Sequence, residues 1–207
     1  MTQRALRILI AEDESVTALA MEQDLRAIGH TVLGIASDGA TAVAMARTLA
    51  PDVAILDVKM PHLNGLDAAK EIHAERPIPI ILVTAFSDAE TIARATDVPV
   101  FSYLVKPVVA AQLSAAIAVA QARHAEWATG RRETEDLRKK LEDRKVIERA
   151  KGILMEREGI TESAAYKTLQ RTSQSRNMSM ADLSRSLLAA EELIRPPQRA
   201  RDDHARP

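Results

Sequence analysis

Residues 53–67 read VAILDVKMPHLNGLD, an apolar run that is broken first by Asp57 and then by a turn. Four apolar residues precede Asp57, and two of them are β-branched, as in a short strand that is buried on both faces of a sheet. After the turn, Asn64 is a favourable N-cap for a helix over 66–74. The stretch therefore predicts a strand over 53–58, a turn and a helix, with a carboxylate at the carboxyl end of the strand.

The same pattern of strand, turn and helix repeats on both sides of this stretch. Short apolar runs predict four more strands, over 6–11, 31–36, 80–84 and 101–105. Amphipathic stretches predict further helices over 16–28, 39–49 and 89–96, and the expected caps of the four helices are Ser15, Asp38, Asn64 and Ser87. Strict alternation of strand and helix is typical of α/β proteins with a parallel sheet. In such sheets the sites lie at the carboxyl ends of the strands.

Beyond Pro107 the chain changes character, because no further strand pattern follows. The periodicity predicts helices over 110–129 and 131–158, interrupted at Gly130, and then over 164–175 and 180–193. The breaks between these helices have helix-ending and helix-capping residues, namely Gly159 with Thr161 and Asn177 with Ser179. The second half is therefore expected to contain an all-α unit of three helices over 137–193.

A helical connector over 111–145 is expected to join the two parts. Its apolar residues fall close to a heptad, namely Leu113, Ala120, Trp127, Leu137 and Leu141, although Arg123, Thr134 and Arg144 would occupy seam positions. This pattern is compatible with a short parallel coiled coil and with a homodimer formed through the connector. Residues 195–207 carry many charges and no apolar periodicity, so we expect them to be disordered.

The composition excludes several classes of protein. Among 207 residues, 28 Lys and Arg face 29 Asp and Glu, 46% are hydrophobic and none is cysteine. No uncharged apolar stretch is long enough to span a bilayer, which predicts a cytoplasmic protein without a membrane partner. A chain without cysteine has neither a thiolate metal site nor a catalytic cysteine. Five aromatic residues are too few for an RNA-binding sheet with a stacking surface.

The two halves of the chain differ in charge. Residues 1–110 carry 9 basic and 14 acidic side chains (net −5), whereas residues 111–207 carry 19 and 15 (net +4). This step indicates that the second half meets an anionic or amphipathic partner, although the excess is mild for a nucleic-acid-binding domain.

Five chemically active side chains are predicted at one edge of the sheet. Glu12 and Asp13 follow the first strand, Asp57 ends the third, and Thr84 and Lys106 end the fourth and fifth. Three adjacent carboxylates repel one another and require a cation, and hard oxygen ligands favour Mg²⁺. With a hydroxyl and an ammonium group beside them, the set favours a phosphoryl-transfer site with Asp57 as nucleophile. Taken singly, each residue could equally be a solvated loop residue.

These residues resemble the receiver domains of two-component response regulators over residues 5 to about 122. The resemblance is carried by ILIAEDE at 8–14, ILDVKMPHLNGLD at 55–67, ILVTAFSD at 81–88 and FSYLVKPV at 101–108. It implies a flavodoxin-like five-stranded sheet of order 2-1-3-4-5 within a domain spanning about 1–122. It also implies that Asp57 is the phosphoacceptor for a sensor histidine kinase. Mg²⁺ would be bound by Asp13, Asp57 and the carbonyl of Lys59, with Glu12 acting through water.

The same resemblance implies a switch built from Thr84 and Tyr103. The Thr84 hydroxyl would move toward the phosphoryl group and allow the Tyr103 ring to turn inward, although a half-buried strand aromatic is an equally good interpretation of Tyr103 alone. It also implies a cis peptide bond before Pro107. Such a protein is not an enzyme in the usual sense, beyond slow self-dephosphorylation.

Residues 137–193 resemble the ANTAR domain, an RNA-binding module that acts in transcription antitermination. The stretch IERAKGILMEREG at 147–159 carries most of this resemblance, and Ala165, Tyr166 and Leu169 fit the second helix. The small residues Ala150 and Gly152 are expected at a close helix–helix approach. Tyr166 is expected in the core, with base stacking as the alternative. The sequence departs from the family at Ser173 and Ser184, which predicts looser packing there.

Basic side chains in this part are candidates for contact with RNA phosphates. They are Arg144, Lys145, Arg149 and Lys151, within two helical turns, and Lys167 and Arg171, spaced i, i+4 on the next helix. The acidic neighbours Glu142, Asp143, Glu148 and Glu156 leave open an ordinary solvated face.

Three functions remain open at this point. The first is a phosphorylation-controlled regulator that binds hairpins in nascent RNA and prevents transcription termination. The second is a phosphorylation-dependent switch whose helices bind another protein. The third, a DNA-binding regulator, is weakened by the absence of a recognition helix rich in Arg, Asn and Gln. An ordinary metabolic phosphatase fits least well.

Overall fold

The computed structural model describes residues 4–85 and 100–194, which fall into two compact units, Met1–Gly130 and Arg131–Pro207. The helix predicted over 89–96 with its cap Ser87, and the tail over 195–207, lie outside the described residues.

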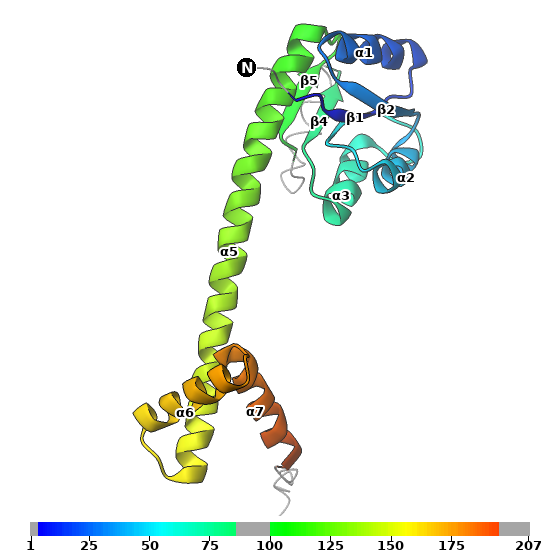
Figure 1. Ribbon diagram of the computed structural model, residues 1–207. Helices are drawn as coiled ribbons and strands as arrows, with labels where there is room; N and C mark the ends of the chain where they lie inside the picture. The colour runs from blue at the N-terminus through cyan, green and yellow to red at the C-terminus, as the bar shows by residue number, and fades with distance from the viewer. Residues whose placement is uncertain (1–3, 86–99, 195–207) are drawn as a thin grey trace, which may run out of the picture. The chain divides into compact units, whose positions relative to one another are not determined.

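The first unit is built on a five-stranded parallel sheet (Figure 1). Its strands are β1 (Arg7–Ala11), β2 (Thr31–Ala36), β3 (Val53–Asp57), β4 (Ile80–Thr84) and β5 (Ser102–Val105), in the order β2-β1-β3-β4-β5. This is the flavodoxin-like order that the resemblance implied, so that prediction is confirmed. In the register of the sheet, Asp57 pairs with Val83, one residue before Thr84. The carboxyl ends of β3 and β4 therefore lie side by side.

Helices cover both faces of the sheet (Figure 1). Helices α2 (Gly39–Leu49) and α3 (Gly65–Glu75) pack on one face, where alternate strand residues such as Leu9 and Leu56 point. Helices α1 (Ser15–Ala27) and α5 (Ala110–Glu158) cover the other face, around Ile8 and Ile55. The two alternating sets explain why the strands read as continuous apolar runs.

Two of the predicted caps are confirmed and one is wrong. The side chains of Asp38 and Asn64 accept hydrogen bonds from backbone N–H groups three residues on, as N-caps do. Ser15, by contrast, already has helical geometry, and Glu14 is the N-cap of α1 without a side-chain bond to the backbone. The Lys106–Pro107 bond is cis, as implied.

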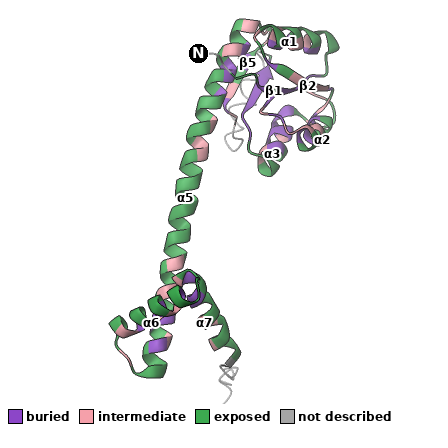
Figure 2. Cartoon of the chain, viewed as in Figure 1, coloured by how far each residue is buried: buried purple, intermediate pink, exposed green. Residues whose placement is uncertain are grey.

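Helix α5 runs without a break through Gly130, which contradicts the predicted interruption. A single glycine costs a helix roughly 1 kcal/mol relative to alanine, and the surrounding helix-forming residues outweigh that cost. The residues of the predicted heptad also differ in how far they are buried. Leu113 and Ala120 are fully buried in the first unit, whereas Leu137 and Leu141 are each 60% exposed. Residues 129–142 are exposed throughout (Figure 2).

The second unit packs the end of α5 against α6 (Glu162–Ser175) and α7 (Met180–Ile194). Ala150, Leu154, Ala165, Leu169 and Leu183 form its core. The predicted breaks are confirmed, because Gly159 has φ of 61° and the side chains of Thr161 and Ser179 cap the following helices. No helix in the described parts of the chain is long and apolar enough to cross a membrane.

Ser173 and Ser184 are buried in this unit. Their hydroxyls donate hydrogen bonds to the carbonyl oxygens of Gln170 and Met180 within their own helices, at 2.9 and 2.7 Å. A serine that bonds to its own helix buries no unsatisfied polar group. The looser packing predicted at these two positions stays a prediction.

Candidate functional site

The three predicted carboxylates do meet at the carboxyl edge of the sheet. Glu12 directly follows β1 and is 2% exposed, and Asp57, the last residue of β3, is 5% exposed, whereas Asp13 is open to solvent. One carboxylate oxygen from each of the three lies within 4.8 Å of the others. The parallel sheet thus brings together residues that are 44 positions apart in the sequence.

Lys106 bridges the two buried carboxylates from the end of β5. Its Nζ lies 2.6 Å from Oδ2 of Asp57 and 2.8 Å from Oε2 of Glu12. The lysine side chain is itself only 25% exposed, so the three charges are largely shielded from water. Like charges on Glu12 and Asp57 are compatible with this burial because a cation lies between them.

The pKa directions follow from this arrangement. Burial raises the pKa of Glu12, and the hydrogen bond from Lys106 only partly opposes it. Burial alone would lower the pKa of Lys106, but its hydrogen bonds to Asp57 and Glu12 outweigh this, so its pKa is raised. Lys106 therefore remains charged at neutral pH.

The backbone around Asp57 forms a close-fitting turn. Oδ1 of Asp57 accepts a hydrogen bond from the N–H of Lys59 at 3.2 Å, and the N–H of Gly65 donates to the carbonyl of Val58 at 3.0 Å. A Cβ at Gly65 would overlap the carbonyl oxygen of Asp57. Gly65 was not predicted as a site residue, although the Asn-Gly pair after Asp57 was a usable signal.

Of the two predicted switch residues, Thr84 lies beside this site, because it follows Val83, the register partner of Asp57. Thr84 is buried and its hydroxyl donates to the carbonyl of Ala85 at 2.9 Å. Tyr103 lies on β5 and is 39% exposed, and its partial burial raises the pKa of its hydroxyl.

The residues present fit a magnesium ion. The donors are all hard carboxylate oxygens, two of them buried and one open to solvent. The ammonium of Lys106 shows that the buried pair already accepts a cation. A cavity of about 460 Å³ lined by Asp13, Lys59 and Asn64 leaves room beside them for water and a small phosphodonor. Such a set suits Mg²⁺, which retains several waters.

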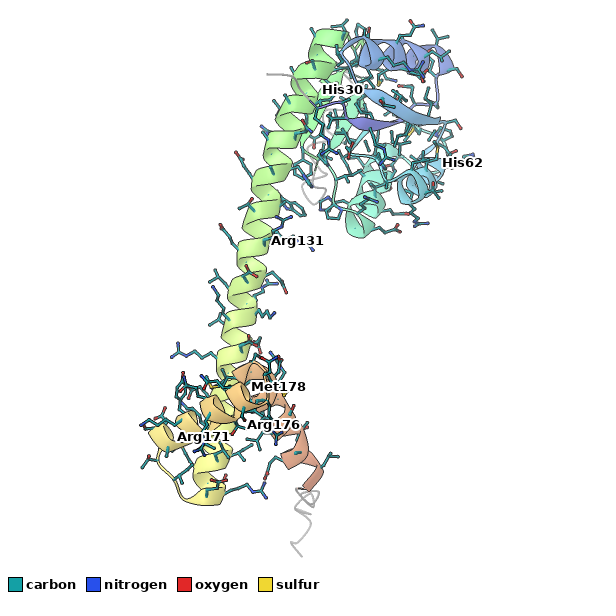
Figure 3. The ribbon with its side chains drawn as sticks, viewed as in Figure 1. His30, His62, Arg131, Arg171, Arg176 and Met178 are labelled. Atoms are coloured by element: carbon teal, nitrogen blue, oxygen red, sulfur yellow. The ribbon has the colours of Figure 1, made fainter. Side chains whose placement is uncertain are left out.

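The predicted basic residues of the second unit do not form one face. Lys145 and Arg149 are spaced i, i+4 and lie together on one face of α5. Arg144 and Lys151 are two turns apart and share another face. Lys167 and Arg171 share a face of α6, and Arg176 follows at its C-cap (Figure 3). Within residues 4–85 and 100–194, no carboxylate lies at ion-pair distance from Arg144, Arg149, Lys167 or Arg171.

Of the other two cations, Lys145 forms an exposed ion pair with Glu142 at 2.8 Å, and Lys151 is held differently. It is buried and its ammonium is bound by Glu148 and Glu162. The prediction that Lys151 contacts RNA phosphate stays a prediction, although in this structure its charge is paired with two carboxylates. Local sequence could not show this, because Glu162 lies across the turn on the next helix.

Two expectations for the second unit are wrong. Tyr166 is 42% exposed rather than part of the core, because it lies one residue beyond the buried Ala165. Ala150 is fully buried against the other helices as expected, but none of the described residues lies within 4 Å of where a Cβ of Gly152 would stand. Gly152 therefore does not mark a close approach between the described helices.

Comparison with known proteins agrees with both units. Residues 8–118 match the response regulator receiver domain, and residues 135–188 match the ANTAR domain. The chain is similar to the transcriptional regulatory protein PdtaR of Mycobacterium tuberculosis, at 41% identity over 182 residues, which cover 88% of this chain and 89% of that protein.

Solved receiver domains resemble the first unit. The signal receiver domain of a modulated diguanylate cyclase from Desulfovibrio desulfuricans G20 is 35% identical with a TM-score of 0.56, and covers 59% of this chain and 98% of its own. A receiver domain from Clostridium thermocellum is 33% identical with a TM-score of 0.55, and the match covers 60% of this chain and 99% of that domain. Sequence motifs, sheet order and acidic site thus agree, and this chain belongs to the two-component response regulators that join a receiver domain to a C-terminal ANTAR domain.

Proposed function

We propose that this chain accepts a phosphoryl group on Asp57 from a sensor histidine kinase and then binds hairpins in nascent RNA, which prevents transcription termination. The single observation that carries the first half is the bridge from Lys106 to Asp57 and Glu12, which assembles nucleophile, acid cluster and cation at one edge of the sheet. The match to the ANTAR domain supports the second half.

In this mechanism a carboxylate oxygen of Asp57 attacks the phosphorus atom of a phosphohistidine. The O–P bond forms as the P–N bond breaks, and the electron pair leaves with the imidazole, which takes up a proton. Lys106, already 2.6 Å from Asp57, is placed to bind a phosphoryl oxygen, and the Thr84 hydroxyl to bind another. Mg²⁺, held by Asp13, Asp57 and the carbonyl of Lys59 with Glu12 acting through water, would neutralise charge on the phosphoryl oxygens.

Phosphorylation would change the hydrogen-bond partners of Lys106 and Thr84. The phosphoryl group adds charge and three strong acceptors beside Lys106 and Thr84. Thr84 would then exchange the carbonyl of Ala85 for a phosphoryl oxygen, and the exposed ring of Tyr103 would turn inward. This supports a local rearrangement around β4 and β5 as the first step of signalling.

The phosphoacceptor is tested by labelling the full chain with acetyl phosphate. We expect labelling to require Mg²⁺ and to be lost in Asp57→Asn, which keeps the shape of the side chain. Asp13→Ala should weaken Mg²⁺ binding more than Glu12→Ala, since only Asp13 is a direct ligand. Labelling of Asp57→Asn at the wild-type rate would refute the assignment.

Binding to RNA is tested over a salt series with a two-hairpin RNA selected from the transcripts of the host. We expect affinity to fall steeply with salt, to exceed affinity for a scrambled RNA and for duplex DNA, and to rise on phosphorylation. Equal affinity for the scrambled RNA would contradict this half of the proposal.

One observation favours the alternative of a protein-binding switch. A cavity of about 310 Å³ lies between α6 and α7, and it is lined mainly by apolar residues, including Leu154, Leu169, Leu183 and Leu187. Such a cavity could accept an apolar side chain of a partner protein. Loss of RNA binding specificity together with phosphorylation-dependent capture of one defined protein would favour this function instead.

A further inference from the structure

Lys151 is the one buried cation among the described Lys and Arg side chains of the second unit. Its side chain is 9% exposed, and Nζ lies 2.8 Å from Oε2 of Glu148 and 2.6 Å from Oε1 of Glu162. Glu148 lies one turn earlier on α5, whereas Glu162 is the first residue of α6. The ammonium therefore ties the two helices together across the turn that joins them.

The two carboxylates around Lys151 face the solvent. The side chains of Glu148 and Glu162 are 53% and 67% exposed. Their hydrogen bonds raise the pKa of Lys151, and the bond from Lys151 lowers the pKa of Glu162, so Lys151 and Glu162 are both charged at neutral pH. An approaching phosphate would meet carboxylate oxygens before the ammonium, and like charges repel it.

The contact between Lys151 and Glu162 lies beside the turn that joins α5 to α6. Gly159 has φ of 61°, which ends α5, and the Thr161 hydroxyl accepts a hydrogen bond from the N–H of Ala164 at 3.4 Å, which begins α6. A carboxylate in the first turn, here Glu162, is stabilised by the helix dipole. The bond to Lys151 adds a restraint between the helices that capping alone does not supply.

The cations proposed to meet RNA lie on both of these helices. Lys145 and Arg149 are on α5, and Lys167 and Arg171 are on α6. Their relative placement depends on how α6 is joined to α5. We propose that Lys151 is a positioning residue of the RNA-binding face, which holds α6 against α5 through Glu162 and does not itself contact phosphate. This inference rests on the proposed binding of RNA.

The direction in which one substitution changes RNA affinity distinguishes a positioning role of Lys151 from direct contact with phosphate. Glu162→Gln removes a negative charge, so simple electrostatics predicts tighter binding of RNA, whereas loss of the positioning contact predicts binding that is roughly tenfold weaker. Lys151→Met should weaken binding similarly, and Lys151→Arg should restore most of it. Neither Glu162→Gln nor Lys151→Met should change the slope of log affinity against log salt. Arg149→Ala, the matched contact variant, should reduce that slope by about 0.7 to 0.9.

The experiment uses the full chain and the selected two-hairpin RNA, well below the midpoint of thermal unfolding. A contact that only stabilises the fold would lower that midpoint and leave affinity unchanged, which would overturn the proposal. Tighter binding by Glu162→Gln, or a smaller salt slope in Lys151→Met, would also overturn it and make Lys151 a phosphate contact.

Failure of the proposed function gives a different result, because the wild-type chain then prefers no structured RNA over a scrambled one. That outcome removes the RNA-binding role of Lys151 together with the function. Hydrogen exchange then decides whether the restraint on α6 exists. Amides of residues 162–166 should exchange faster in Glu162→Gln than in wild type, and equal exchange would refute the restraint as well.

Discussion

Gly65 matters to phosphorylation although it carries no side chain. A Cβ at this position would overlap the carbonyl oxygen of Asp57, which is backbone and has little freedom to move. We therefore expect Gly65→Ala to displace Asp57, slow labelling by acetyl phosphate by at least roughly tenfold and destabilise the first unit by about 1–3 kcal/mol.

Gly152→Ala is the matched control for this prediction, because nothing lies within 4 Å of its Cβ position. It should leave labelling unchanged. Wild-type labelling by Gly65→Ala, measured at the same Mg²⁺ concentration, would show that the turn adapts without moving Asp57.

His30 makes the stability of the first unit depend on pH. It is buried, and its Nδ1 accepts a hydrogen bond from the N–H of Leu6 at 3.4 Å, which requires an unprotonated Nδ1 (Figure 3). Burial lowers its pKa below the ordinary value of 6.5. The unfolded chain therefore binds the proton more readily, and the free energy of unfolding should fall as pH drops below about 6.5.

Urea unfolding at pH 7.5 and pH 5.5 measures this effect. In His30→Gln, the free energy of unfolding should differ less between the two pH values than in the wild type. His62→Asn serves as the control, because His62 is exposed and its φ of 62° is tolerated by asparagine. An unchanged pH dependence in His30→Gln would assign the effect to other groups.

Single residues show where sequence reasoning succeeds and where it fails. The positions of Glu12, Asp57 and Lys106 followed from strand ends, because a parallel sheet brings those ends to one edge. The role of Lys151 could not be predicted, because its second partner Glu162 belongs to another helix. The prediction that Tyr166 lies in the core was wrong for a related reason, because neighbouring residues of a helix point 100° apart.

Among the elements, strands were predicted more closely than helix ends. The bounds of β2, β4 and α2 match the expected ranges residue for residue. Apolar runs that end at a charged or turn residue define a strand sharply, whereas Ser15 and Glu14 are both compatible with the start of α1. The break expected at Gly130 shows that an isolated glycine lowers helix stability without ending a helix.

Gly130 should nevertheless be a weak point of α5. It lies in the exposed part of the helix, where its low helix propensity is not offset by burial. Gly130→Ala should stabilise the helix locally by about 1 kcal/mol, which raises amide protection near residue 130 by roughly fivefold. Gly130→Pro should have the opposite and larger effect. Equal amide protection in wild type and Gly130→Ala would mean that the low helix propensity of glycine does not limit the local stability of α5.

At the scale of the whole molecule, the boundary between the two units after Gly130 predicts that they can be separated. Truncation after Gly130 keeps Trp127, which packs against the core of the first unit. We expect the truncated chain to be phosphorylated at the wild-type rate and to bind no RNA, because every cation proposed to contact RNA lies beyond the cut. Labelling and RNA titration of the same preparation check both halves.

The matched control is a truncation after His124, which removes Trp127 as well. It should unfold at a lower temperature than the longer fragment. RNA binding by the fragment 1–130 at wild-type affinity would place the binding surface on the receiver domain instead.

Trp127 also has a practical consequence. It is the only tryptophan in the chain, and its ring lies 4.8 Å from that of His73 and 5.7 Å from that of His124, measured between centroids. Phe101, at the start of β5, completes this cluster at 6.1 Å. Indole emission therefore reports on a single place, where α5 leaves the sheet. The protein carries its own fluorescent probe, which can follow the unfolding of this cluster in real time without an attached dye.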